Sequence, residues 1–119
     1  MATTLEAQVR AAGAGATIDL HGDIDGGARD AIDRSYTEAA GRGDGAVLLN
    51  FTDVGYINST GIALIVGLLA RARAEGRPVA ACGLSDHYQT IFEITRLSDF
   101  MSIYPDETAA QAAHERSER

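Results

Sequence analysis

The stretch that decides the fold is residues 56–76, which read YINSTGI at 56–62 and continue as ALIVGLLARARAEG at 63–76. The polar residues Asn58, Ser59 and Thr60 stand directly before the most apolar segment of the chain. Asn, Ser and Thr accept hydrogen bonds from the unpaired amides of a first helical turn, so the stretch predicts a helix from Thr60 to about Glu75. The dipole and free amides of a helix start also favour an anion, which makes the Ser59 hydroxyl a place for a phosphoryl group.

Composition is typical of one ordinary globular domain. The chain has 119 residues, of which 45% are hydrophobic and 23% charged, and its formal net charge is -7. We expect a single domain over 1–119, with the core at about 5–113 and a short polar C-terminal tail. The acidic balance disfavours nucleic acid and direct membrane binding. No signal peptide or membrane-spanning run is recognisable, and Cys82 is expected to be a buried hydrophobe, so we predict a cytoplasmic protein without disulfides.

The order of apolar patterns along the chain predicts an α/β domain. Alternating or continuous apolar runs indicate strands at 5–10, 16–21, 46–51, 78–83 and 100–104. Apolar residues at three- to four-residue spacing indicate about four helices, at 28–39, 60–75, 85–97 and from 106 onward. Strands that alternate with helices favour a mostly parallel sheet of four to five strands, and glycines at 13 and 15 favour an N-terminal antiparallel hairpin. Ligand sites in such sheets lie after the carboxyl ends of strands, here at 22–27, 52–60 and 83–86.

Metal binding and catalysis have little support in these loops. The acidic first loop departs from the calcium-binding pattern because Gly27 occupies a ligand position. Nucleophilic catalysis at Ser59 needs an adjacent base, and the spacing of His21, His87 and His114 ties none of them to that serine. The G-x-S-x-G elbow of hydrolases is also absent. We therefore predict no catalytic residues, no metal and no cofactor, and the protein is not expected to be an enzyme.

A phosphoryl group on Ser59 would act on binding and leave the fold intact. It would add a charge of about -1.5 to -2, and the amides of Thr60, Gly61 and Ile62 would face it. A partner docked at the same place would have to accommodate this charge as it loses solvent. The helix entrance is therefore predicted to be a switch for partner binding.

Two motifs resemble the STAS domain of bacterial anti-sigma factor antagonists. NSTGI at 58–62, before an apolar helix, is similar to the family's Asp-Ser-Ser/Thr-Gly, and GDID at 22–25 looks like its Gly-Glu-Leu-Asp. With the order of elements, the resemblance extends from Leu5 to about Ala113 and implies a single STAS-like domain. Asn58 departs from the family's usual Asp, which removes a negative charge beside Ser59 while keeping the ability to cap the helix.

The resemblance implies a phosphorylation-switched regulator. By it, Ser59 matches the serine phosphorylated by an anti-sigma factor kinase of the histidine-kinase-like ATPase class, and Thr60 is the second-choice acceptor. The unphosphorylated antagonist binds this kinase and frees the sigma factor, phosphorylation releases the antagonist, and a PP2C-type phosphatase resets the cycle. Asp23 and Asp25 match acids close to the phosphorylation site. The expected partner-binding residues are Asp23, Asp25, Asn58, Ser59, Thr60, Gly61 and Ile62.

Two alternatives remain open at this point. The first is a constitutive structural or scaffold STAS subunit, for example of a stress-signalling or lipid-transport assembly, in which Ser59 only caps the helix. The second is a small nucleotide-binding or hydrolytic enzyme on the same architecture. Uptake of phosphate on Ser59 separates the switch from the scaffold, and turnover that depends on His21 or His87 would indicate the enzyme.

Overall fold

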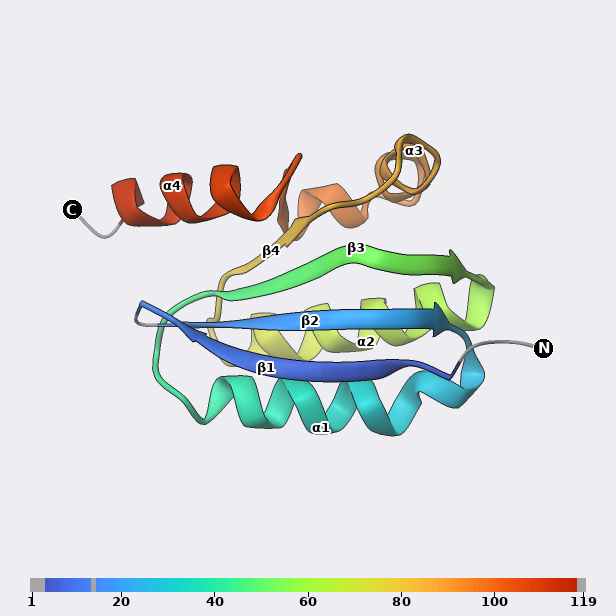
Figure 1. Ribbon diagram of the computed structural model, residues 1–119, viewed down its shortest axis with the longest axis horizontal. Helices are drawn as coiled ribbons and strands as arrows, with labels where there is room; N and C mark the ends of the chain where they lie inside the picture. The colour runs from blue at the N-terminus through green and yellow to red at the C-terminus, as the bar shows by residue number, and fades with distance from the viewer. Residues whose placement is uncertain (1–3, 14, 118–119) are drawn as a thin grey trace.

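The computed structural model describes residues 4–13 and 15–117, with side chains up to Ala113. Within this part of the chain, five strands form one sheet in the order β1-β2-β3-β4-β5. The strands are β1 (Glu6–Ala12), β2 (Gly15–Ile24), β3 (Val47–Ile57), β4 (Val79–Cys82) and β5 (Ser102–Tyr104). The helices are η1 (Gly26–Ala28), α1 (Arg29–Ala40), α2 (Ser59–Ala74), α3 (Asp86–Ile94), η2 (Leu97–Asp99) and α4 (Glu107–Ser117). Figure 1 shows α1 and α2 running alongside the long strands β2 and β3.

The predicted fold class is confirmed. Strand β1 pairs with β2 in antiparallel register, and the pairs β2–β3, β3–β4 and β4–β5 are parallel. The turn between β1 and β2 contains Gly13 with a φ of 59°, a left-handed conformation that suits glycine. The sheet is therefore mostly parallel, and its N-terminal hairpin supplies the antiparallel edge.

Two strands are longer than predicted, and their ends determine where the site lies. We expected strands at 16–21 and 46–51, but β2 continues to Ile24 and β3 to Ile57. Their polar and glycine residues break the apolar alternation, yet the backbones stay paired, with Gly22 opposite Val54 and Ile24 opposite Ile57. Register shifts in this pair accommodate the irregular pattern. The loops that follow both strands are consequently much shorter than the predicted 22–27 and 52–60.

The C-terminal third differs in two details. The predicted helix at 85–97 ends at Ile94, because Arg96 takes a left-handed φ of 65°, and the short η2 follows. The last helix extends into the predicted polar tail, since α4 continues to Ser117. Its predicted start is confirmed, because the Oδ1 atom of Asp106 accepts a hydrogen bond from the amide of Ala109 at 2.8 Å and so caps α4.

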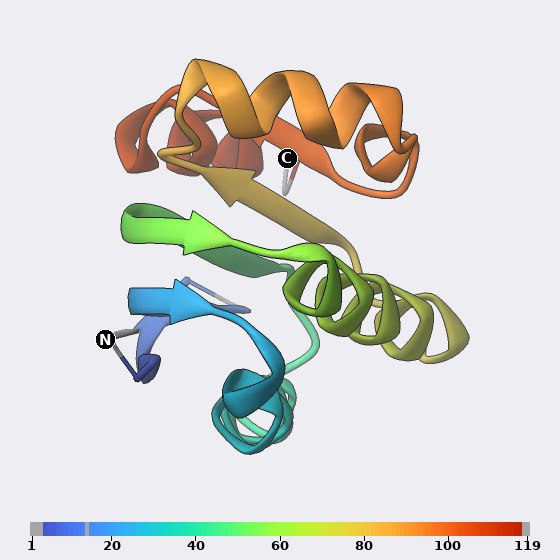
Figure 2. The ribbon, with the colours of Figure 1, turned by 90° about the vertical axis from the view of Figure 1, so that its right-hand side faces the viewer.

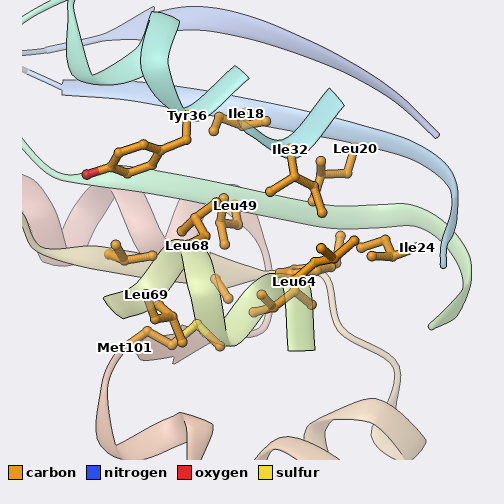
Figure 3. Packing of buried hydrophobic residues seen from close by; sticks show 14 of the residues in the cluster. Ile18, Leu20, Ile24, Ile32, Tyr36, Leu49, Leu64, Leu68, Leu69 and Met101 are labelled. Atoms are coloured by element: carbon orange, nitrogen blue, oxygen red, sulfur yellow. The ribbon is translucent and has the colours of Figure 1, made fainter. Parts of the chain in front are cut away.

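The main core lies between one face of the sheet and helices α1, α2 and α3. Side chains that point to this face from the strands pack with the apolar sides of the helices, as Figure 3 shows for α1 and α2. Its members include Ile18, Leu20, Leu49, Ile32, Tyr36, Leu64, Leu68, Tyr88 and Phe92. Helix α4 packs on the opposite face, where Ala110 contacts a smaller cluster with Leu48 and Cys82. The sheet is thus covered on both faces, as the continuous apolar run of β3 predicts.

The prediction for Cys82 can be compared with this packing, and Arg10 makes contacts that were not predicted. Cys82 is fully buried, as expected, and burial raises the pKa of its thiol to about 11. Arg10 of β1 donates hydrogen bonds to the carboxylates of Asp19 and Glu107 and thereby ties the outer face of the sheet to α4. The hydrogen bond from Arg10 holds the pKa of the Asp19 carboxyl below its usual range.

Candidate functional site

The candidate site lies where β2 and β3 end side by side. Because the two strands are parallel and in register, Ile24 and Ile57 finish at the same edge of the sheet. The amide of Asn58 donates a hydrogen bond to the carbonyl oxygen of Ile24 at 3.2 Å, which joins the two chain segments just after the strands. Figure 2 looks onto this edge, where η1 and α2 begin next to each other. A site here is built from two segments that are distant in sequence, as expected for a parallel sheet.

Asn58 is the residue that caps α2. Its Oδ1 atom accepts a hydrogen bond from the amide of Gly61 at 2.8 Å, and its carbonyl oxygen accepts one from Ile62 at 2.9 Å. The helix therefore begins at Ser59, one residue earlier than predicted, and the idea that Ser59 acts as the cap is wrong. The amides of Gly61 and Ile62, which we expected to be free, are occupied. The free donors of this helix start are those of the first turn before them, at Ser59 and Thr60.

The side chains of Ser59 and Thr60 are exposed to solvent. Both lie in the first turn of α2, where the helix dipole places partial positive charge. The Ser59 hydroxyl is not needed to hold the helix, because Asn58 already caps it. This serine can therefore change its chemistry without removing a hydrogen bond that the described structure uses.

Gly61 allows the start of α2 to approach β2 closely. A Cβ atom at this position would lie 2.0 Å from the carbonyl oxygen of Ile24, so any side chain would collide with the backbone. A Cβ atom on Gly26 would lie 3.6 Å from the Cγ2 atom of Thr60, so the η1 turn lies close to the same helix start. The glycine of the NSTGI motif is thus explained by packing, and Ile62, which follows it, is half-buried.

The two predicted acids lie on the neighbouring segment. Asp25 is half-buried and its Oδ1 atom accepts a hydrogen bond from the amide of Gly27 at 2.9 Å, which caps η1. Asp23 is the register partner of Tyr56 near the end of β3 and is also half-buried. The structure thus brings the GDID and NSTGI motifs to one edge of the sheet. Asp25 thus has a structural role as the cap of η1.

A further residue of this edge, Tyr88, could not be found from the sequence. Its hydroxyl oxygen accepts a hydrogen bond from the amide of Ile57 at 2.8 Å, which fixes the end of β3 to α3. Its ring is buried, and the contact of its hydroxyl with Ile57 depends on the tertiary fold. Tyr88 therefore supports the backbone immediately before Asn58.

The two histidines whose side chains are described each contact another residue. The Nδ1 atom of His21 lies 3.1 Å from a carboxylate oxygen of Asp53, and His87 is exposed and packs edge-on against Tyr88. The side chain of His114 lies outside the described residues. The described part of the chain contains no group of three or more His, Cys, Asp or Glu arranged to hold a metal ion. None of its helices is long and apolar enough to cross a membrane.

Removing the cap should destabilise the domain. Asn58→Ala is expected to lower the free energy of unfolding by about 1 kcal/mol, because the Gly61 amide loses its acceptor. Asn58→Asp keeps a side-chain oxygen at the same place and is the matched control, so its free energy of unfolding should equal or exceed that of the original chain. Urea denaturation followed by circular dichroism measures both. If both variants lost the same free energy of unfolding, the loss could not come from the capping oxygen, because Asn58→Asp keeps it.

The fold and the site together define a class of protein, a mixed α/β domain with an exposed serine at the start of a helix that packs on a mostly parallel sheet. The chain belongs to the STAS domain family, whose family model matches residues 6–110. This confirms the resemblance seen in the sequence motifs.

Comparison with individual proteins agrees with this membership. Over 61 residues the chain is 39% identical to the anti-sigma-B factor antagonist of Listeria monocytogenes, a match that covers 50% of this chain and 54% of the relative. The chain thus spans about half the length of the curated relatives it matches.

Solved structures are similar over nearly the whole chain. An anti-sigma factor antagonist from Mycobacterium paratuberculosis has a TM-score of 0.79 at 14% identity, covering 93% of this chain and 94% of that one. The Bacillus cell fate determinant SpoIIAA, in its phosphorylated form, has a TM-score of 0.67 at 20% identity, covering 90% of this chain and 98% of that one. Because both identities are low, these two similarities show that the chain has the same fold and nothing more.

Proposed function

We propose that this protein is an anti-sigma factor antagonist whose binding is switched by phosphorylation of Ser59. In its unphosphorylated form it binds an anti-sigma factor that is also a serine kinase of the histidine-kinase-like ATPase class. Transfer of the γ-phosphoryl group of ATP to the Ser59 oxygen releases ADP and ends this binding. A PP2C-type phosphatase hydrolyses the phosphoester and restores the binding form. The protein acts in the cytoplasm by binding and has no catalytic step of its own.

The observation that carries the proposal is the exposed Ser59 side chain at the first position of α2. Because Asn58 supplies the cap, a phosphoryl group on Ser59 breaks no hydrogen bond of the described structure. The new charge lies at the positive end of the helix dipole, which favours it. The fold therefore accommodates the modification, and its effect is concentrated on whatever docks at this edge.

The neighbouring residues suit a docking surface around the acceptor. Thr60 is exposed, Asn58 and Ile62 are half-buried, and the carboxylates of Asp23 and Asp25 lie on the adjoining segment. This combination offers a partner both apolar contact and hydrogen-bonding groups. Membership of the STAS family and the similarity to anti-sigma factor antagonists support this assignment.

Phosphate transfer tests the proposal directly. The purified chain is incubated with ATP and the kinase-type ATPases encoded near its gene, and its intact mass is recorded. We expect the addition of one phosphoryl group, which peptide mapping assigns to Ser59. Ser59→Ala should abolish the uptake, whereas Thr90→Ala, at an exposed position on α3, should leave it unchanged.

Each other outcome has a defined meaning. Uptake that persists in Ser59→Ala and disappears in Thr60→Ala would assign the acceptor to Thr60 and contradict the proposal for Ser59. Tight binding to the kinase without any addition of a phosphoryl group would identify a constitutive scaffold subunit instead. Addition of a PP2C-type phosphatase to the phosphorylated chain should restore the original mass and, with it, binding to the kinase.

A further inference from the structure

Helix α2 has an apolar face that nothing in the described chain covers. From Ser59 to Ala70 the helix has no charged residue, and its inward side fills the core. The opposite side, which we call the outer face of α2, is exposed at Ala63, Val66, Gly67 and Ala70. A surface helix normally carries charged and polar residues on its solvent side, and a helix that is apolar all round is normally buried. The composition of α2 is that of a helix covered on both sides.

A groove runs beside the outer face. It has a volume of about 240 Å³ and lies between α2 and the segment around η2. Val66 and Phe100 are 46% and 52% exposed, so two large apolar side chains border it. The lining residues are Val66, Leu69, Ala70, Arg73, Thr95, Leu97 and Phe100. Apolar exposure of this kind, with an arginine at the rim, is typical of protein–protein interfaces.

Gly67 is a second sign of external contact. It lies in the middle of α2, where glycine weakens a helix. A Cβ atom at this position would meet nothing within 4 Å, so packing inside the described chain does not require glycine. A glycine on an exposed helix face allows the backbone of another element to approach closely.

The charges at the two ends of α2 indicate which element approaches its outer face. The start of the helix lies beside Ile24 and Gly26, the two residues that flank Asp25, whereas its last turn carries Arg71 and Arg73. The guanidinium of Arg73 stacks 5.3 Å above the ring of Phe100, and among the described residues it has no ion-pair partner. A second α2 laid antiparallel on the first would place Arg73 of each copy near the segment of the other copy that contains Asp25. The outer face is therefore self-complementary, as an isologous interface requires.

We propose that the outer face of α2 is a homodimer interface in which two copies of this chain pack antiparallel about a two-fold axis beside Gly67. The axis places Arg73 of one copy opposite Thr60 of the other and Ala63 opposite Ala70. The apolar side chains between them fill the groove, and the arginine lies near Asp25 of the second copy. Thr60 then belongs both to this interface and to the surface of the proposed switch. Where that proposed function holds, the homodimer and the kinase complex exclude each other.

Analytical ultracentrifugation of the purified chain tests the interface without kinase or ATP, so its result is independent of the proposed switch. From low micromolar to several hundred micromolar protein, we expect the average mass to rise from 12.5 kDa towards twice that value. Val66→Glu and Ala70→Glu should hold the mass at one chain throughout, with an unchanged circular dichroism spectrum because both positions are exposed. Thr90→Glu, on exposed α3, is the matched control and should associate like the original chain.

A cross-link locates the axis. Gly67→Cys is expected to form a disulfide-linked dimer under mild oxidation, because the axis brings residue 67 close to its own copy. Thr90→Cys should stay a single chain, and the native Cys82 is buried and does not interfere. A mass of one chain at the highest concentration would overturn the proposal. So would association that survives Val66→Glu, or cross-linking of Gly67→Cys no faster than that of Thr90→Cys.

Discussion

Gly61→Ala is expected to lower the free energy of unfolding by about 3 kcal/mol. The added Cβ atom would lie 2.0 Å from the carbonyl oxygen of Ile24, and this atom belongs to the backbone of β2, which no side-chain rotation can move. The helix start would have to shift away from the sheet, which would also strain the hydrogen bond from the Asn58 amide to Ile24. Urea denaturation at low micromolar protein measures the loss.

Gly67→Ala is the matched control in the same helix. A Cβ atom at this position meets nothing within 4 Å, so alanine should raise the free energy of unfolding by about 0.5–1 kcal/mol through its better helix propensity. The two glycine variants should therefore move in opposite directions. If Gly61→Ala unfolds at the same urea concentration as the original chain, the close contact between α2 and β2 does not exist in solution.

Ser59→Glu is expected to weaken binding to the anti-sigma kinase about 100-fold, which corresponds to about 3 kcal/mol. The substitution places a carboxylate where the phosphoryl group would be, at an edge that already carries Asp23 and Asp25. A docked partner would have to bury this charge without a matching group, and an uncompensated buried charge is strongly unfavourable. Isothermal titration calorimetry with the purified kinase measures the affinity.

Two comparisons keep this result interpretable. Ser59→Ala should bind with an affinity within about threefold of the original chain. In binding free energy this difference is well under 1.4 kcal/mol. Neither variant should unfold more easily, because Ser59 does not cap the helix and an acid in the first turn of a helix is favourable. Equal affinities for Ser59→Glu and Ser59→Ala would remove the switch from the proposed function.

Much of the fold followed from the sequence because its signals are local. The apolar run at 46–51 and the apolar segment that follows Thr60 each reflect a single element, and the structure confirms the strand and the helix that they predict. The ends of β2 and β3 were missed because their polar residues, such as Asp23, carry no strand pattern. Only the parallel neighbour keeps them extended, and pairing between distant segments is not visible in a local pattern.

The structure brings the residues of the predicted site together at the start of α2, but the division of roles among them was not predicted. Asn, Ser and Thr are all good caps, so propensity alone does not distinguish Asn58 from Ser59. The choice depends on where the strand ends, since the bond from the Asn58 amide to Ile24 sets the first helical residue. The hydroxyl of Tyr88 on the amide of Ile57 is a tertiary contact of the same kind.

The hydrogen bond between Asn58 and Ile24 has a consequence for which chains, folded or unfolded, an enzyme can recognise. Ser59, the proposed acceptor, and the acidic GDID segment become neighbours only after β2 and β3 have paired, so an unfolded chain does not present the two segments together. An enzyme that recognises both segments would modify mature molecules and ignore nascent or damaged ones. If the proposed function holds, the phosphorylated fraction would then measure how much of the protein is correctly folded.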